Sequence, residues 1–429
     1  MSLKNLRFDT LQAHAGQVPD PATGSRAVPI YQTTSYTFES VEDAAEIFAL
    51  RKEGNIYTRI NNPTTDVLEK RVAALEGGVS AVAFASGMAA ITAAICNLAV
   101  RGEEIVAAST LYGGTHTLFV DRFPTRHGIQ CRLVDIDDFD ALESAINDKT
   151  RAVYFETLGN PNINIPDIEA VCKIAHKYGL PVICDNTFGT PYLVRLKDWG
   201  VDICVHSATK YLGGHGTSVA GIVVDYGTFP WKGNARFADF NDPDPGYHGI
   251  VYADLGADAF AKKLRAQILR DEGACLSPFN AFLILLGVET LSLRVERHCR
   301  NAERIAEFLS ESEYVSWVNY PYLKNDRYRP RMEKYMPKGC GSILTFGIRG
   351  GLEAGRKFIE HLTIFSHLAN VADAKSLIIH PASTTHSQLD EEALAHGGIS
   401  ADMIRVSVGL EDAEDLIEDL ENALRLSQQ

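Results

Sequence analysis

The sequence lacks the marks of a secreted, disulfide-bonded or zinc-binding protein. Its eight cysteines include no pair at C-x-x-C spacing, and several stand in apolar runs such as PVICD and VDICV. This pattern predicts buried free thiols in a reducing compartment. The N-terminal stretch MSLKNLRFDT has no apolar segment of the kind that a secretory signal needs. We therefore expect a cytoplasmic protein.

A surplus of positive charge is also missing. The chain has 41 basic and 55 acidic residues, and the formal net charge of −14 argues against nucleic acid or an anionic membrane as partner. Residues 80–100 carry no charge and are long enough to span a bilayer, but Ala, Ser and Gly dominate them. Because Ser86 and Gly87 introduce a turn, the stretch predicts a strand followed by a helix in a soluble protein.

The chain is too long for one ordinary core. Its 429 residues favour two or three domains. Residues 1–62 are loop-rich and predict an N-terminal arm, residues 63–260 a large domain, and residues 261–429 a smaller C-terminal domain. A stretch rich in Pro, Gly, Asp and aromatic residues, 225–258, marks an insertion or linker. The sequence contains no internal repeat and no low-complexity tract.

Short apolar runs alternate with amphipathic segments in the first half of the chain. The runs predict seven strands, at residues 81–86, 104–109, 129–136, 151–157, 181–187, 202–208 and 218–224. Strand and helix alternation predicts an α/β fold with a mainly parallel seven-stranded sheet, which binds ligands at the carboxyl ends of its strands. Residues 276–309 predict a long helix, or two, leading into a domain with strands in SILTFGI and MIRVSVG.

Two of the predicted strand ends carry groups suited to an anion. In ASGMAA a strand turns directly into a helix, so the backbone N–H groups of Ser86, Gly87 and Met88 could bind a phosphate. Many strand-to-helix turns contain glycine, so this signal alone is weak. In HSATKYLGGHG, Ser207 and Thr209 could donate to the same anion. The glycines follow the lysine of this motif, which excludes a Walker pattern.

A lysine and an aspartate stand at the same predicted edge. Lys210 comes just after an apolar strand and the small hydroxyl residues Ser207 and Thr209. A desolvated lysine beside an anion site is a candidate for an imine with a carbonyl compound. Asp185 follows four apolar residues in PVICDNTF, where its carboxylate could keep a ring nitrogen protonated. Lysine, acid and phosphate cradle together match the requirements of pyridoxal 5'-phosphate.

The motifs YTRINNPT, ASGMAAI, LYGGTH, ETLGNP, CDNTF, HSATKYLGGH and RVSVGLE resemble the Cys/Met-metabolism family of fold-type-I pyridoxal-phosphate enzymes. The resemblance extends from about residue 6 to 425 and implies an aspartate-aminotransferase-like fold. Within the family, the O-acetylhomoserine sulfhydrylases look most similar, because of the insertion at 225–258 and the segment NVADAKSLIIHPASTTHSQL. The resemblance also implies a homotetramer whose dimers share active sites.

The resemblance assigns roles to residues. Lys210 would be the imine lysine and Asp185 the partner of the ring nitrogen, while Tyr112 would stack on the ring and assist proton transfer. The other implied cofactor contacts are Ser86, Gly87, Met88, Asn160, Ser207, Thr209 and, from a neighbouring subunit, Tyr57 and Arg59. Arg405 would clamp the substrate carboxylate, helped by Ser376, and Tyr57 would also contact the substrate. Without a neighbouring subunit, Tyr57 and Arg59 would be a surface arm, and Arg405 could be a structural ion pair.

The resemblance implies γ-replacement, in which O-acetyl-L-homoserine and sulfide give L-homocysteine and acetate in methionine biosynthesis. Alternatives are cystathionine γ-synthase, cystathionine γ-lyase or methionine γ-lyase activity, a transaminase, and a cofactor-binding protein without activity. Methionine γ-lyases carry cysteine in the Y-G-C motif where this chain has Gly114, which disfavours that activity. No metal is expected, because His206 and His215 have no second ligand at suitable spacing, and His206 is predicted to pack beside the sheet.

Overall fold

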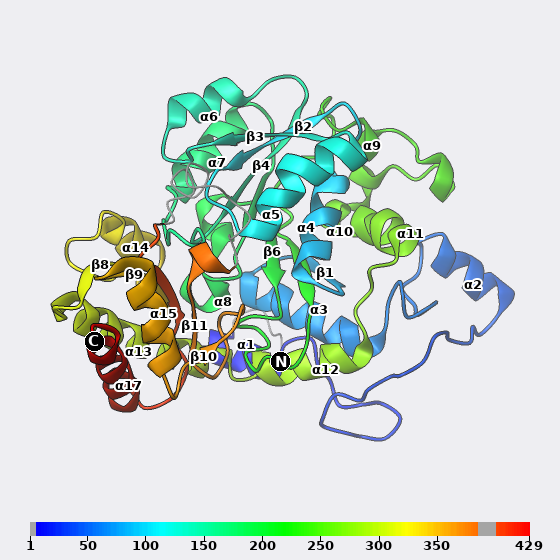
Figure 1. Cartoon of the computed structure of the whole chain (residues 1–429). Helices are drawn as coiled ribbons and strands as arrows, with labels where there is room; N and C mark the ends of the chain where they lie inside the picture. The colour runs from blue at the N-terminus through cyan, green and yellow to red at the C-terminus, as the bar shows by residue number, and fades with distance from the viewer. Residues whose placement is uncertain (1–5, 385–399) are drawn as a thin grey trace.

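The computed structural model describes residues 6–384 and 400–429, and two β-sheets organise them (Figure 1). The larger sheet has the order β1-β7-β6-β5-β4-β2-β3. Its strands are β1 (Ser80–Phe84), β2 (Glu104–Ala108), β3 (Gln130–Val134), β4 (Thr150–Glu156), β5 (Val182–Asp185), β6 (Ile203–Ser207) and β7 (Gly221–Asp225). Only β7 runs against the others, so the mainly parallel seven-stranded sheet predicted from the sequence is confirmed.

The smaller sheet has the order β10-β11-β12-β9-β8 and lies in the C-terminal half. Its strands are β8 (Val315–Asn319), β9 (Ile343–Ile348), β10 (Ser366–His367), β11 (Leu377–Ile379) and β12 (Met403–Ser407). Strands β9 and β12 were predicted. The segment NVADAKSLIIHPASTTHSQL, quoted above for its resemblance, contains β11, and its last five residues lie outside the described ranges.

Helices cover both sheets. They are α1 (Phe8–His14), α2 (Val41–Phe48), α3 (Pro63–Glu76), α4 (Gly87–Cys96), α5 (Gly113–Thr117), α6 (Phe139–Ala145), α7 (Ile168–Lys177), α8 (Thr190–Leu193), α9 (Ala238–Asn241), α10 (Ala259–Lys263), α11 (Arg270–Glu272), α12 (Pro278–Val288), α13 (Leu291–Glu311), α14 (Arg329–Tyr335), α15 (Gly351–His361) and α17 (Ala413–Ser427). The 3-10 and π segments are η2 (Leu118–His127), η3 (Leu196–Trp199), η4 (Pro245–Tyr247), η5 (Tyr252–Leu255), η6 (Leu264–Leu269) and η7 (Pro381–Ser383).

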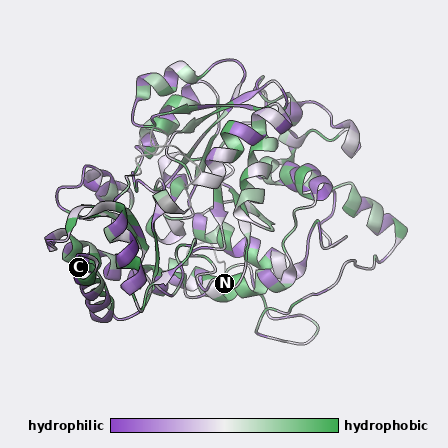
Figure 2. Ribbon diagram, in the orientation of Figure 1, coloured by the Kyte–Doolittle hydropathy of each residue, from purple (hydrophilic) through white to green (hydrophobic). Residues whose placement is uncertain are grey.

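The apolar pattern of each helix matches its place in the fold. Helix α4 is apolar on all sides, and it packs against the neighbouring strands β6, β7 and β1 of the larger sheet. Helix α7 buries Ile168, Val171, Cys172 and Ala175 and exposes its other face. Helices α13, α15 and α17 combine hydrophilic and hydrophobic residues in the same way beside the smaller sheet (Figure 2). The core therefore consists of two sheets, each shielded by helices.

The run at 276–309 forms two helices. Helices α12 and α13 are joined at a bend of 61°. Together they have the length and composition of a bent membrane span, but both bury much of their apolar surface within the fold. Among the described residues, no single helix is long and apolar enough to cross a membrane.

Residues 6–60 run along the outside of the molecule. Between α1 and α3 the chain leaves the body and carries α2 at its edge (Figure 1). Val18 and Val41 on this arm are 77% and 82% exposed. The predicted domain limits at 62 and 260 stay predictions. Helix α10, which spans the second limit, and η6, which follows it, contact β7, β1 and α4.

Candidate functional site

The predicted site residues gather at one edge of the larger sheet. Asp185 and Ser207 end the parallel strands β5 and β6, and Ser86 follows β1. Tyr112 and Asn160 follow β2 and β4. Since carboxyl ends of parallel strands meet at one edge, positions spread over more than 120 residues of sequence share a single location.

The turn after β1 lies very close to the end of β6. Ser86 caps α4 by accepting from the N–H of Ala89 at 3.1 Å. A Cβ added at Gly87 would lie 2.7 Å from the Ser207 Cβ, so only glycine lets the two strand ends approach this closely. The N–H groups of Gly87 and Met88 are at positions without an acceptor inside the helix. The two strand ends therefore form a small, polar cradle.

The two hydroxyl residues at the end of β6, Ser207 and Thr209, differ in their hydrogen bonds. The Thr209 hydroxyl contacts both backbone groups of Ala220, at 3.2 Å for the carbonyl and 3.0 Å for the N–H. The Ser207 N–H donates to the Thr187 hydroxyl at 2.8 Å. The Ser207 side chain remains half-buried beside Gly87 and is the one best placed to meet an anion in the cradle.

Asp185 is buried and held by its neighbours. Its Oδ1 accepts from the Thr187 N–H at 2.9 Å and from the Thr187 hydroxyl at 2.5 Å, and Oδ2 lies 3.5 Å from the Tyr154 hydroxyl. Burial raises the pKa of Asp185, and the Thr187 hydrogen bonds oppose that rise. The carboxylate is thus fixed in orientation and would gain from a cationic partner.

A second buried acid, Glu156, lies beside Asp185. The two residues are partners in the β4–β5 register. Burial and the Asp185 charge raise the pKa of Glu156 well above its ordinary value. Glu156 Oε1 accepts the Tyr112 N–H at 2.7 Å. Sequence reasoning quoted Glu156 within ETLGNP but assigned it no role.

Lys210 stands just after β6 and is half-buried. Burial, followed by the charge of Arg405, lowers the pKa of its amine to about 8. Its Nζ donates to Oδ1 of Asn370, a residue that sequence reasoning did not single out. The lysine predicted to be reactive therefore has the perturbed pKa that a nucleophile needs.

Arg405 lies on β12 and is 7% exposed. Its Nη1 donates to Asn160 Oδ1 at 3.3 Å. Across residues 6–384 and 400–429 no carboxylate pairs with its guanidinium, although buried charges in proteins are normally paired. Ser376, its predicted helper, is fully buried, and its hydroxyl donates to Glu411 at 3.0 Å, so its contact with a substrate stays a prediction.

The remaining predicted residues are exposed. Tyr112 is 50% exposed at the edge of the site, which leaves its ring free to stack on a ligand. The Arg59 guanidinium lies 5.2 Å from the centre of the Tyr57 ring on the arm. Within the described chain neither arm residue contacts Lys210, Asp185 or Ser86 through a hydrogen bond or ion pair.

His206 lies beneath the site and not in it. It is buried, as predicted, and its Nε2 lies 2.6 Å from Glu76 Oε1. With Cys204 these residues form a compact group of potential metal ligands, which sequence spacing could not reveal because Glu76 is 130 residues away. Glu76 also accepts from Asn186 at 2.9 Å and from Tyr226 at 2.7 Å. These hydrogen bonds already satisfy the acid, so we interpret the group as structural.

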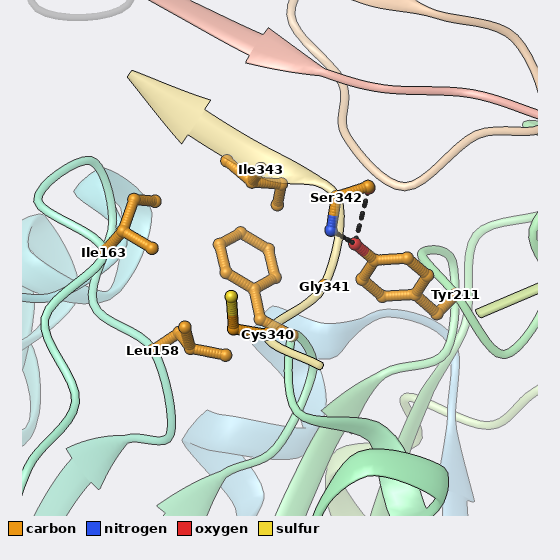
Figure 3. Close-up of a pocket in the computed structure, with 8 residues that line it drawn as sticks. Leu158, Ile163, Tyr211, Cys340, Gly341, Ser342 and Ile343 are labelled. Carbon is orange, nitrogen blue, oxygen red and sulfur yellow. Dashed lines mark hydrogen bonds between the residues drawn. The ribbon is translucent and has the colours of Figure 1, made fainter. Parts of the chain in front are cut away.

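An apolar pocket lies between the loops of the two sheets and is distinct from the site. Leu158, Ile163, Cys340 and Ile343 line it, and the Tyr211 ring forms its side (Figure 3). The Tyr211 hydroxyl accepts the Ser342 N–H at 2.7 Å. The pocket has no space for a water-sized molecule, so it is a packing gap next to the lysine loop.

Comparison with known families and proteins identifies the family of the chain. The sequence matches the Cys/Met metabolism PLP-dependent enzymes over residues 9–425. The chain belongs to this family. It is 52% identical to the O-acetyl-L-homoserine sulfhydrylase of Leptospira meyeri, over 98% of this chain and 97% of that protein. It is 48% identical to the homocysteine synthase of Schizosaccharomyces pombe, over 100% of both.

A solved structure agrees with the sequence match. The putative O-acetylhomoserine (thiol)-lyase of Campylobacter jejuni superposes with a TM-score of 0.95 at 43% identity, covering 98% of this chain and 100% of that one, and it carries a pyridoxyl-lysine phosphate. The protein is therefore a fold-type-I enzyme that uses pyridoxal phosphate, as the sequence predicted. The glycine-lined cradle, the buried Asp185 and the lysine of lowered pKa fit that cofactor.

Proposed function

We propose that this enzyme replaces the acetoxy group of O-acetyl-L-homoserine with sulfide and releases L-homocysteine and acetate. The observation that carries the proposal is the buried Arg405 beside Lys210, which has no carboxylate partner among the described residues. Such an arginine and lysine together suit the carboxylate and amine of an α-amino acid. The names of the relatives at 52% and 48% identity support the acyl group and the sulfur donor. Homocysteine lacks one methyl group of methionine, which suggests a place in methionine biosynthesis, in the cytoplasm.

The cradle would hold the cofactor at its phosphate end, and Asp185 would hold it at the ring nitrogen. The N–H groups of Ser86, Gly87 and Met88, with the Ser207 hydroxyl, would bind the phosphate. The Thr209 hydroxyl would join them by exchanging its hydrogen bond to the Ala220 carbonyl for one to the phosphate. Asp185 would face the ring nitrogen and keep it protonated. When bound, pyridoxal phosphate supplies the electron sink that makes protons on the substrate carbons acidic.

Lys210 would move the protons. With a pKa of about 8 its amine is about one tenth free base at pH 7, far more than an ordinary lysine. It would take the Cα proton of the substrate and then a Cβ proton, whose electron pair expels the acetate from Cγ. After sulfide has added at Cγ, it would return protons to Cβ and Cα. Tyr112 would cover the cofactor ring and assist these transfers, and Asn160 would contact the ring hydroxyl while orienting Arg405.

Arg405 would bind the substrate α-carboxylate through two parallel hydrogen bonds. Because the guanidinium is buried before substrate arrives, the binding step would supply the missing opposite charge. Ser376 would support this contact through the turn it forms with Gly409, whose N–H donates to the Ser376 hydroxyl at 2.8 Å.

Each active site would be shared between two subunits of a homotetramer. Tyr57 and Arg59 are exposed on an arm that leaves its own body, and Val18 and Val41 on the same arm leave apolar surface uncovered. A partner subunit would cover this surface and receive Tyr57 and Arg59 at its phosphate cradle and substrate site.

Gly114 favours replacement over methionine cleavage. A Cβ at this position would lie 2.6 Å from Cε1 of the Tyr112 ring, so the cysteine that methionine γ-lyases carry here would displace this ring from its present position. Tyr112 could remain in its present position only with glycine here.

A product assay tests the proposal. Purified enzyme is incubated with acetyl-, succinyl- or phosphohomoserine and sulfide, and separately with cysteine or methionine. We expect homocysteine chiefly from the acetyl ester with sulfide. Cystathionine from cysteine, or methanethiol from methionine, as the faster product would contradict it.

A further inference from the structure

The amine of Lys210 has one hydrogen-bond partner among the described residues, and that partner is Asn370. Nζ donates to the amide oxygen Oδ1 across a separation of 160 residues. Lys210 follows β6 of the larger sheet, whereas Asn370 lies between β10 and β11 of the smaller one. The contact therefore joins the two halves of the molecule at the reactive nitrogen.

The backbone around Asn370 is firmly held. The Ala372 N–H donates to the Ser407 hydroxyl at 2.8 Å, and the Ala374 N–H donates to the Gly214 carbonyl at 3.0 Å. Ala372 has a φ of +59°, in the region that L-residues rarely occupy. Such a conformation persists only where surrounding contacts enforce it. The Asn370 amide is thus presented from a fixed platform, while the lysine stem is flexible.

We propose that Asn370 is a positioning residue that holds the Lys210 amine in place whenever that nitrogen is not covalently bound. This inference rests on the proposed function, in which the substrate displaces Lys210 from the cofactor and the freed amine then moves protons. An uncharged amide oxygen suits the task. It orients the N–H bonds through one acceptor without adding the negative charge that would favour the ammonium form.

The reason for such a residue lies in the reaction. In γ-replacement a single amine serves more than one carbon of the substrate, so it must stay close to the substrate without being attached to it. A free lysine side chain samples many rotamers, and fixing it in a productive position lowers the barrier. The charged group that acts on the amine is Arg405 on β12, and its effect is to lower the lysine pKa.

The first test compares Asn370→Ala with wild type. We expect unchanged cofactor content and resting absorbance, a KM within about twofold, and a kcat lowered roughly tenfold through the lost hydrogen bond. Asn422→Ala is the matched control, since Asn422 is an exposed asparagine on α17 whose amide oxygen accepts from Arg425 at 3.3 Å. A role limited to structure would instead lower cofactor content and the melting temperature together.

The second test uses Asn370→Asp, which keeps the shape of the side chain and adds a charge next to Nζ. We expect the pKa of Lys210 to rise by about one unit. A raised lysine pKa reduces the free base at any given pH, so the acidic limb of the kcat profile should move to higher pH. Labelling of Lys210 by acetic anhydride in the cofactor-free full chain, measured by peptide mass spectrometry, should show the same shift without reference to turnover.

Unchanged kcat, pH profile and labelling in both variants would overturn the inference. The proposed function would survive that result if borohydride still attached the cofactor to Lys210 in wild type. Attachment to another lysine would instead overturn the proposed function and the inference with it.

Discussion

The backbone N–H of Tyr112 donates to Oε1 of Glu156 at 2.7 Å, so the acid at the end of β4 holds the loop that follows β2. Glu156 is also the register partner of Asp185 on β5. Two buried acids side by side cannot both be ionised without cost. A proton on Glu156 leaves the charge on Asp185, the residue that we propose as the partner of the cofactor ring nitrogen.

This arrangement predicts different outcomes for two variants of Glu156. Glu156→Gln keeps a neutral acceptor for the Tyr112 N–H and should retain kcat within about threefold. Glu156→Ala leaves that N–H unpaired and should lower kcat roughly tenfold. Steady-state kinetics with both variants decide the matter. If the glutamine variant were as impaired as the alanine variant, Glu156 would act as a charged group.

Gly87 should not tolerate a side chain. Gly87→Ala would bring a Cβ to 2.7 Å from the Ser207 Cβ and force the two strand ends apart. We expect cofactor retention during dialysis to fall at least tenfold. Gly355→Ala is the control, because the nearest atom to its added Cβ is 3.4 Å away and the helical position favours alanine. Normal retention in Gly87→Ala would mean that the cradle is wider than the structure indicates.

Asp185→Asn should leave the fold intact and slow turnover. The isosteric amide keeps the Thr187 contacts to Oδ1 but cannot stabilise a protonated ring nitrogen. We expect kcat to fall by roughly 100-fold or more, with the melting temperature little changed. Near-normal turnover would show that another group keeps the ring nitrogen protonated.

How far the sequence predicted the structure differs between the two sheets. Most strands of the larger sheet are buried and largely apolar, and all seven were predicted, including the half-exposed edge strand β3, QCRLV. Strand β8, VSWVN, is half-exposed on most of its residues, and β10 has only two residues, so neither leaves a clear apolar pattern. Helix α2 lies in a segment that reads as loop, although Ser40 caps it.

The candidate site shows the same limit in its contacts. Lys210 and Asp185 could be predicted as candidates because ligands bind at the carboxyl ends of the strands in this fold. Asn370 and Glu76 act through side chains that meet only after folding, across 160 and 130 residues. Residue spacing in a single sequence does not predict contacts between side chains so far apart, and only the three-dimensional structure identifies these partners.

The arm tests whether subunits share active sites. Arg59→Ala should weaken cofactor retention, since a charge-assisted contact to phosphate is worth roughly 1.5–3 kcal/mol. Mixing inactive Arg59→Ala and Lys210→Ala subunits under conditions of exchange should restore some sites with both wild-type residues. Verified mixed oligomers without recovered activity would show that the arm serves its own subunit.

The most direct measurement locates the cofactor on the chain. Lys263 offers an internal comparison, because burial lowers its pKa to about 8 as well, yet its Nζ donates to the Asn97 carbonyl at 2.9 Å, away from the sheet edge. Borohydride reduction of the purified enzyme, followed by peptide mass spectrometry, should find the phosphopyridoxyl group on Lys210 and none on Lys263. The group on Lys263, or on any lysine other than Lys210, would contradict the account of this site.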